Sequence, residues 1–138
     1  MSTERYRNQH REILTMVDNI DGYLNEKRLA TENLEVLTLL SRLFGKLAIH
    51  LSIEDNSVYP RLLECSDSSV CSMAKSFSEE MGGIAKIVEE FKGKWGDCQR
   101  IKERPTDFIC ETKGLFQALT LRIEREDKEL YTAFDKLQ

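Results

Sequence analysis

Proline is scarce in this chain: Pro60 and Pro105 are the only two among 138 residues. Proline disrupts the interior of a helix, so its scarcity leaves long stretches in which a helix can run without interruption. Stretches of alternating apolar and polar residues, which indicate β-strands, are also lacking. The sequence therefore predicts an all-α protein.

A cluster of basic residues is also lacking. The chain has 20 Lys and Arg against 24 Asp and Glu, and the basic residues are scattered. Nucleic acid is therefore not an expected partner. We see no apolar run near the length that spans a bilayer, and the opening MSTERYRNQH does not resemble a signal peptide. These features predict a cytoplasmic protein with no membrane partner.

No two of the four cysteines have the C-x-x-C spacing of metal or redox motifs. In a reducing compartment we expect all four to be free thiols. Two of them flank a short polar connection, where redox chemistry is an alternative to an ordinary packing or surface role. The four are Cys65, Cys71, Cys98 and Cys110.

Apolar residues recur at three- and four-residue steps through most of the chain, which is the period of an amphipathic helix. Ser2 and Thr3 are expected to cap the first helix, and serines of CSDSSV the third. Four long helices with short connections predict one domain, 1–138, folded as an antiparallel up-down-up-down four-helix bundle. The helices are expected near residues 3–24, 32–63, 70–94 and 106–136.

The two halves of this bundle resemble each other in sequence. HLSIEDNSVYP from residue 50 aligns with RIEREDKELYT from residue 122, which pairs Glu54 with Glu126 and Tyr59 with Tyr131. HREILTMVDNI from residue 10 aligns with MGGIAKIVEEF from residue 81. The offsets of 72 and 71 residues agree to within one position. We therefore interpret the bundle as a duplicated helical hairpin.

Several polar residues stand on the apolar stripes, where aliphatic side chains are the usual choice. In an antiparallel bundle, inward positions of four helices meet at one level, and bundles hold metal ions at such positions. A metal-free network of ion pairs and hydrogen bonds is an equal alternative for this set. The residues expected to meet are His10, His50, Glu54, Met81, Arg122 and Glu126.

These motifs resemble the hemerythrin-like HHE cation-binding family over essentially the whole chain. QHREI matches the family's first-helix motif at His10, and HLSIEDNSVYP matches its second-helix motif at His50 and Glu54. The resemblance implies a four-helix bundle with one histidine on each helix and an H-x-x-x-E pair on helices two and four. Together these hold a non-haem di-iron centre. The chain departs from the pattern at Met81 and Arg122, which replace the third- and fourth-helix histidines.

The resemblance and its departures together imply a reduced metal site. His10, His50, Glu54 and Glu126 remain as ligands, so we expect one iron ion or none, and no full di-iron centre. The family implies binding or sensing of iron, dioxygen or nitric oxide, with an output through an unidentified protein partner. The alternative is a metal-free interaction or regulatory module in which Arg122 replaces the charge of the cofactor. An enzyme ranks third, because no nucleophile–base pair or phosphate loop is visible.

Some neighbours of this site are harder to interpret. Arg122 is expected to face Glu54 and to pair with a carboxylate, while Tyr59 and Tyr131 are interpreted as packing residues. Two adjacent glycines, 82–83, cost roughly 1 kcal/mol each relative to alanine inside a helix. A kink, a close contact between helices, an opening toward the centre or a weak helix without a role would each account for them.

Overall fold

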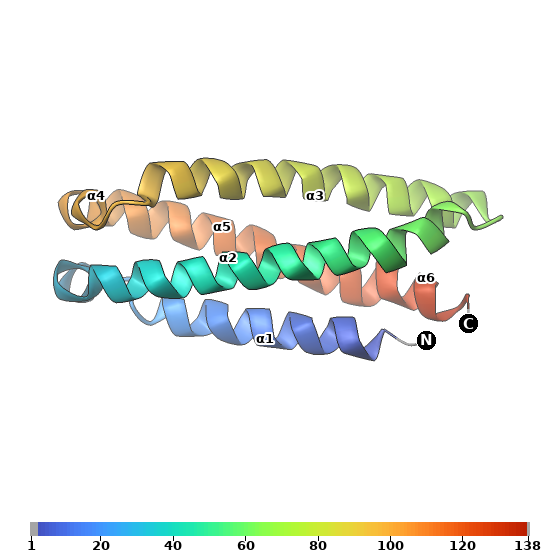
Figure 1. Ribbon diagram of the computed structural model, residues 1–138, viewed down its shortest axis with the longest axis horizontal. Coiled ribbons are helices and arrows are strands. Elements are labelled where there is room, and N and C mark those ends of the chain that lie inside the picture. Colours follow the sequence, from blue (N-terminus) through green and yellow to red (C-terminus); the bar gives the residue numbers. More distant parts are fainter. Residues whose placement is uncertain (1–2, 138) are drawn as a thin grey trace.

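The computed structural model describes residues 3–137, and within that range every regular element is helical (Figure 1). The predicted all-α class is therefore confirmed, in the form of a helical bundle. The elements are α1 (Glu4–Asp21), α2 (Glu26–Leu63), α3 (Ser68–Trp95), α4 (Cys98–Glu103), α5 (Pro105–Arg125), the π-helical turn η1 (Glu126–Leu130) and α6 (Tyr131–Asp135).

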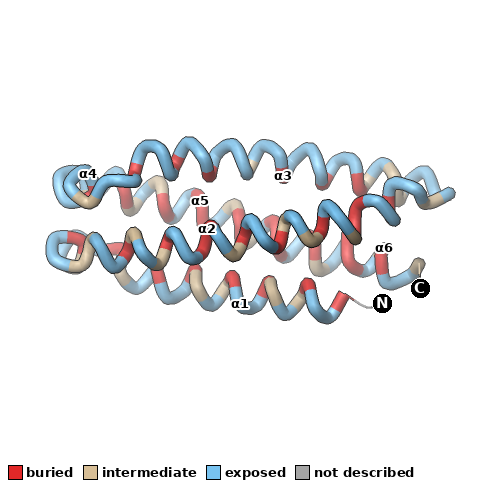
Figure 2. Tube along the Cα trace, viewed as in Figure 1, coloured by how far each residue is buried: buried red, intermediate tan, exposed pale blue. Residues whose placement is uncertain are grey.

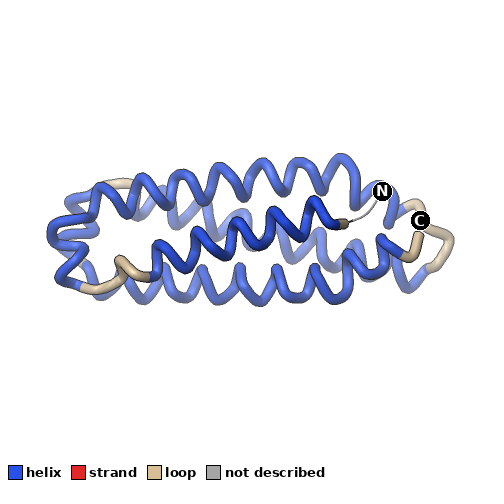
Figure 3. Tube along the Cα trace, turned by 90° about the horizontal axis from the view of Figure 1, so that it is seen from below, coloured by secondary structure: helices blue, strands red, loops and turns tan. Residues whose placement is uncertain are grey.

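The long helices lie side by side along one axis of an elongated molecule (Figures 1 and 3). The two ends of the chain lie together at one end of the bundle, and α4 lies at the other end. The first turn of α1 is tied to α6, because Thr3 Oγ1 donates to Asp135 Oδ2 over 2.8 Å and Thr3 N donates to Asp135 Oδ1 over 3.1 Å. These bonds connect the start of the first helix to the last helix.

The second helix begins earlier than the sequence predicted, at Glu26 instead of near residue 32. Asn25 caps this helix, because it has extended backbone angles and its side chain accepts a hydrogen bond from Arg28 N over 2.9 Å. The first helical residue, Glu26, therefore lies six residues before the predicted start. A local break explains the misplaced boundary, since Glu32 has non-helical angles (φ −115°, ψ 23°) inside α2.

The last predicted connection is not all loop, because it contains α4. Asp97 caps this short helix by accepting from Gln99 N over 2.9 Å, and Ile101 is fully buried against the core. Pro105 then starts α5, where its missing N–H removes no helical hydrogen bond.

Two of the predicted caps were wrong. Thr3 occupies the cap position of α1, but its side chain makes no capping bond because its hydroxyl is engaged with Asp135. Ser2 lies outside the described residues. At α3 the cap is Asp67 instead of a serine, and its carboxylate accepts from Ser69 N over 2.9 Å.

Buried residues recur along every long helix (Figure 2). The apolar ones form two clusters, and buried polar side chains form a polar layer between these clusters. The larger cluster lies toward α4 and includes Ile13, Leu43, Phe91, Trp95 and Phe108. The smaller lies toward the chain ends and includes Tyr6, Val58, Phe77, Leu130 and Phe134. The buried polar side chains between them are His10, His50, Glu54, Arg122 and Glu126.

One helix, α2, is long and apolar enough to cross a membrane by length and composition alone. The expectation that no apolar run approaches that length was therefore wrong. A core helix passes the same test, and α2 buries Val36, Leu40 and Leu43 against the other helices. The helix also carries His50 and Glu54 on its buried stripe.

We expect Leu43→Ala to lower the free energy of unfolding by about 2–5 kcal/mol, because Leu43 is fully buried and truncation leaves a cavity. Leu34→Ala on the same helix is the matched control, since Leu34 is 67% exposed. Chemical denaturation of the two variants measures the difference. Equal costs would contradict the assigned face of α2.

A second prediction concerns the α3 cap. Hydrogen bonds from the Ser69 side chain and backbone lower the pKa of Asp67, so its stabilising effect is present above its unfolded pKa and lost as pH falls through the lower folded pKa. Asp67→Ala should lower the Tm at neutral pH, with a difference that shrinks at acid pH. Asp67→Asn should keep a cap but remove this pH dependence. Thermal melts across pH measure both effects.

Candidate metal centre

The polar layer is assembled from several helices. His10 comes from α1, His50 and Glu54 from α2, and Glu126 from the first residue of η1. All four side chains are buried, although each stands in a stripe that otherwise holds aliphatic residues. The structure thus brings together the four ligand candidates that the sequence singled out.

The donor atoms of this layer converge closely. The Nε2 atoms of His10 and His50 lie 3.0 Å apart. Oε1 of Glu126 lies 3.3 Å from His10 Nε2, and Oε1 of Glu54 lies 3.1 Å from His50 Nε2. One ligand atom each from His10, His50 and Glu126 fall within 4.8 Å of one another, which is a spacing that could hold a metal ion.

The second nitrogen of each imidazole faces an acceptor. Nδ1 of His10 lies 2.8 Å from Asp127 Oδ1, and Nδ1 of His50 lies 2.5 Å from Gln9 Oε1. Since these oxygens can only accept, the protons of the neutral rings reside on Nδ1 and both Nε2 atoms present lone pairs. A carboxylate behind a histidine orients the ring and strengthens it as a metal ligand.

Tyr131 completes the cluster. Its hydroxyl donates to Glu54 Oε2 over 2.8 Å and lies 3.1 Å from His10 Nε2 and 3.2 Å from His50 Nε2. Its ring stacks on that of His10, with centroids 5.1 Å apart. The sequence predicts only a packing role for Tyr131, and it does not single out Gln9 or Asp127. The E-D-x-x-x-Y spacing shared by the two repeats is the sequence signal that points to Asp127 and Tyr131.

A π-helical turn positions several of these groups. The N–H of Tyr131 donates to the carbonyl of Glu126, five residues back, so the fourth predicted helix is not a single regular helix over 106–136. Within this turn the Asp127 carbonyl accepts from Arg7 Nη1 over 2.9 Å, which connects the turn to α1. The turn also lets Glu126, Leu130 and Tyr131 all face inward. Such turns occur frequently at functional sites.

Arg122 lies on the α3 side of the layer. Its Nη2 donates to Tyr59 OH over 3.0 Å and to the Phe77 carbonyl over 2.6 Å. Its Nε lies 3.7 Å from Glu126 Oε2, an ion pair without the two-bond geometry expected of an arginine–carboxylate pair. Its Nη1 also lies 3.8 Å from Glu80 Oε2, so its carboxylate neighbours are Glu80 and Glu126 instead of the expected Glu54, and its two hydrogen bonds go to neutral acceptors.

Met81 stands beside this arrangement without joining the cluster of donor atoms. It is buried in α3 and lines a cavity of about 170 Å³ together with Tyr59 and Gly82. A Cβ added at Gly82 or Gly83 would meet no atom within 4 Å, so the glycine pair does not serve a close contact between helices. Both glycines are exposed on α3, and only Gly82 of the pair lines this cavity.

Burial and charge act in opposite directions on the ionisable groups. Burial would lower the pKa of His10, but Glu126 and Asp127 outweigh it and the pKa is raised. Burial likewise would raise the pKa of Glu54, but the hydrogen bond and charge of His50 outweigh it and the pKa is lowered. The pKa of Glu126 is raised, chiefly by burial. The layer therefore attracts positive charge, as a proton or as a cation.

The donor set fits a metal ion. Two ligands at right angles, each about 2.1 Å from a metal, lie about 3.0 Å apart, close to the separations found here. Among residues 3–137, the buried side-chain atoms without a hydrogen-bond partner are Glu54 Oε1 and Glu126 Oε2 in the layer, Nε and Nη1 of Arg122 beside it, and Trp95 Nε1. Imidazole nitrogens with carboxylate oxygens suit iron, zinc or manganese.

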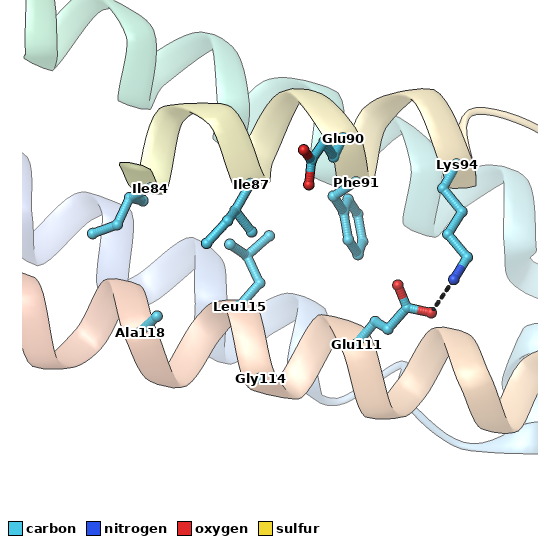
Figure 4. A pocket seen from close by; sticks show the side chains of 9 residues that line it. All are labelled: Ile84, Ile87, Glu90, Phe91, Lys94, Glu111, Gly114, Leu115 and Ala118. Atoms are coloured by element: carbon cyan, nitrogen blue, oxygen red, sulfur yellow. Dashed lines mark hydrogen bonds and ion pairs between the residues drawn. The ribbon is translucent and has the colours of Figure 1, made fainter. Parts of the chain in front are cut away.

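A surface groove of about 500 Å³ lies elsewhere, between α3 and α5 (Figure 4). Ile84, Ile87, Phe91 and Leu115 form an apolar floor. Lys94 Nζ pairs with Glu111 Oε2 over 2.7 Å at one side of it. The residues lining this groove contribute no atom to the polar layer.

All four cysteines are free thiols, as expected from their spacing.

Comparison with known proteins agrees with this geometry. The family model described as the hemerythrin HHE cation binding domain matches residues 1–134 of the chain. No curated protein and no solved structure matches it. The matched range includes every residue of the polar layer.

We expect Asp127→Ala to weaken divalent metal binding by about 10- to 100-fold, because the carboxylate orients His10 and raises its basicity. Asp55→Ala is the matched control, since Asp55 occupies the equivalent repeat position but is exposed. Isothermal titration of both variants with one divalent metal measures the ratio. Equal affinities would show that Asp127 has no part in the site.

Proposed function

The chain belongs to the hemerythrin HHE cation-binding domain family, and we propose that it binds a single iron ion through His10, His50, Glu54 and Glu126. In this proposal residues 1–138 form one antiparallel up-down-up-down bundle. The helix α4 belongs to a connection, and α5, η1 and α6 together make the fourth long element. The duplicated hairpin would supply one complete half of a metal centre and one altered half.

The observation that carries the proposal is the crowding of acceptors in the layer. With their protons on Nδ1, the imidazoles of His10 and His50 direct lone pairs at each other over 3.0 Å. Carboxylate oxygens of Glu54 and Glu126 lie beside them. Each unsatisfied buried polar atom costs about 1–3 kcal/mol. A cation would satisfy several of these atoms at once.

The altered half of the site supports a count of one metal. Met81 and Arg122 stand where the family pattern has its other two histidines. At an effective dielectric near 20, a unit positive charge about 4 Å from a divalent ion costs on the order of 8 kcal/mol before screening. Arg122 is fixed by Tyr59 and by the Phe77 carbonyl, which leaves it little freedom to move away.

We propose that the protein binds or senses iron, dioxygen or nitric oxide, and that a protein partner responds to the bound state. Iron bound in the layer would supply redox chemistry toward such diatomic molecules. The protein's part is to orient His10 and His50 through Asp127 and Gln9. The apolar clusters on both sides of the layer limit the access of water.

A metal-free regulatory module is the second candidate, and the placement of Arg122 favours it. The guanidinium lies 3.7 Å from Glu126 and so compensates part of the buried negative charge. A proton shared by His10 and Glu126 would compensate more, in keeping with the raised pKa of both groups. In this alternative the polar layer keeps the bundle in register and its surface serves a partner.

Metal titration distinguishes the two candidates. We expect the protein to bind one Fe(II) per chain, and His50→Ala to abolish binding because it removes one of the two imidazoles. Arg122→His, and more strongly Arg122→His with Met81→His, should raise the affinity or the number of metals bound. Anaerobic titration with metal analysis measures the count.

Ile87→Ala is the control for this titration, since Ile87 lies on the α3 surface away from the layer. Two tightly bound ions in the parent protein would contradict the reduced site. No binding by the parent protein would leave the metal-free module as the better account. If the Arg122 variants bound no more metal than the parent, Arg122 would not be what blocks the second ion.

A further inference from the structure

We propose that Tyr131 is itself a ligand of the metal ion, binding through its phenol oxygen. This inference rests on the proposed metal binding and adds to it a residue outside the histidine and carboxylate set. It also predicts which ion the site prefers, namely a trivalent ion such as Fe(III) over a divalent ion such as Zn(II).

The position of the hydroxyl carries the argument. The oxygen of Tyr131 lies 3.1 Å from His10 Nε2 and 3.2 Å from His50 Nε2, and these two nitrogens lie 3.0 Å from each other. The three atoms thus form a nearly equilateral triangle with the edge length of adjacent ligands around one ion. The Tyr131 hydroxyl thus adds a third potential donor atom to the two imidazole nitrogens at the spacing of metal ligands.

The hydroxyl of Tyr131 has only one proton, which limits it to one donated hydrogen bond. Glu54 Oε2 accepts that proton over 2.8 Å, so the remaining lone pairs of Tyr131 face the two histidines. Those nitrogens present lone pairs as well, because their rings donate through Nδ1 to Asp127 and Gln9. Three mutually facing acceptors repel one another unless an added proton or a metal ion lies between them, and a metal ion can bind all three at once.

The ring has little freedom to turn away. Tyr131 is fully buried, stacks on His10, and lies 5.7 Å from the ring of Tyr6 between centroids. The π-helical turn sets this orientation, because the N–H of Tyr131 bonds to the carbonyl of Glu126 in the same cluster. A ligand held by rigid neighbours loses little entropy when it binds an ion.

The repeat shows that the role is specific to one tyrosine. Tyr59 aligns with Tyr131, but its hydroxyl accepts from Arg122 Nη2 over 3.0 Å. The positive guanidinium stands where the other hairpin has a histidine. Tyr59 therefore faces a cationic side chain, and Tyr131 faces the ligand cluster.

Charge explains the preference for a trivalent ion. On binding, the O–H bond of Tyr131 would break, its proton would leave to solvent by way of Glu54, and an oxygen lone pair would bind the ion. The carboxylates of Glu54 and Glu126 with the phenolate then carry three negative charges. Arg122, whose Nε lies 3.7 Å from Glu126 Oε2, compensates part of this charge, and a trivalent ion neutralises the remainder more fully than a divalent ion. A bound metal favours the deprotonated form of its ligands.

Spectroscopy of the full chain tests the assignment. Loading with Fe(III) should produce a visible phenolate-to-iron charge-transfer band and tyrosinate modes in the resonance Raman spectrum, while loading with Zn(II) should produce neither. Tyr131→Phe should lose the band and still bind iron through the remaining residues. Tyr6→Phe is the matched control, because Tyr6 is buried nearby but its hydroxyl bonds to Ser57 Oγ over 2.7 Å.

The outcomes separate this inference from the proposed function. Iron bound by the parent protein without the band, or a band that persists in Tyr131→Phe, would overturn the assignment and leave metal binding intact. A parent protein that binds no iron would overturn both. The parent spectrum is decisive even if Tyr131→Phe does not fold, and circular dichroism of each variant checks that it does.

Discussion

Burial of negative charge in the middle of the bundle is the constraint on which the rest of the structure depends. Glu54 and Glu126 lie in a layer closed on both sides by apolar clusters, where an uncompensated carboxylate is very costly. The neighbouring side chains each offset part of that cost. The histidines can take up a proton or a metal ion, Tyr131 donates a hydrogen bond to Glu54, and Arg122 supplies a fixed positive charge next to Glu126.

The two sequence repeats differ at this layer, and the difference explains how one layer can hold both a candidate cation site and a fixed positive charge. Arg122 occupies the position in the second repeat that His50 occupies in the first. The hydroxyl of Tyr59 accepts from Arg122, and the hydroxyl of Tyr131 lies beside His50. The π-helical turn occurs in the second hairpin and not in the equivalent, regular part of α2. As a result Asp127 reaches His10, while its repeat counterpart Asp55 stays exposed. One side of the layer is therefore suited to a cation and the other already carries one.

The side-chain atoms that would bind a metal ion are also the atoms that compensate one another's charge in the folded protein. Removing one member of a buried charged network leaves its partners unpaired and is far more costly than the net value of the network. Substitutions at the layer therefore need two readouts, metal affinity and folding, to be interpreted. Substitutions one contact away, at Asp127 or Gln9, act on the imidazoles while leaving the charge of the buried carboxylates in place.

The sequence by itself determined the helical class, the inward stripes and the set of four candidate ligands, because helical periodicity and the repeat are local patterns that survive without coordinates. It misplaced the start of α2 at the break near Glu32, and it missed the short helix α4 and the π-helical turn, since these depend on capping and on contacts between distant segments. Only the tertiary structure decided the partners of each polar atom. A hydrogen bond forms only when helices place its two atoms within tenths of an ångström of the right distance. The sequence alone therefore could not show that Tyr131 bonds to Glu54, or that Arg122 bonds to Tyr59 and the Phe77 carbonyl.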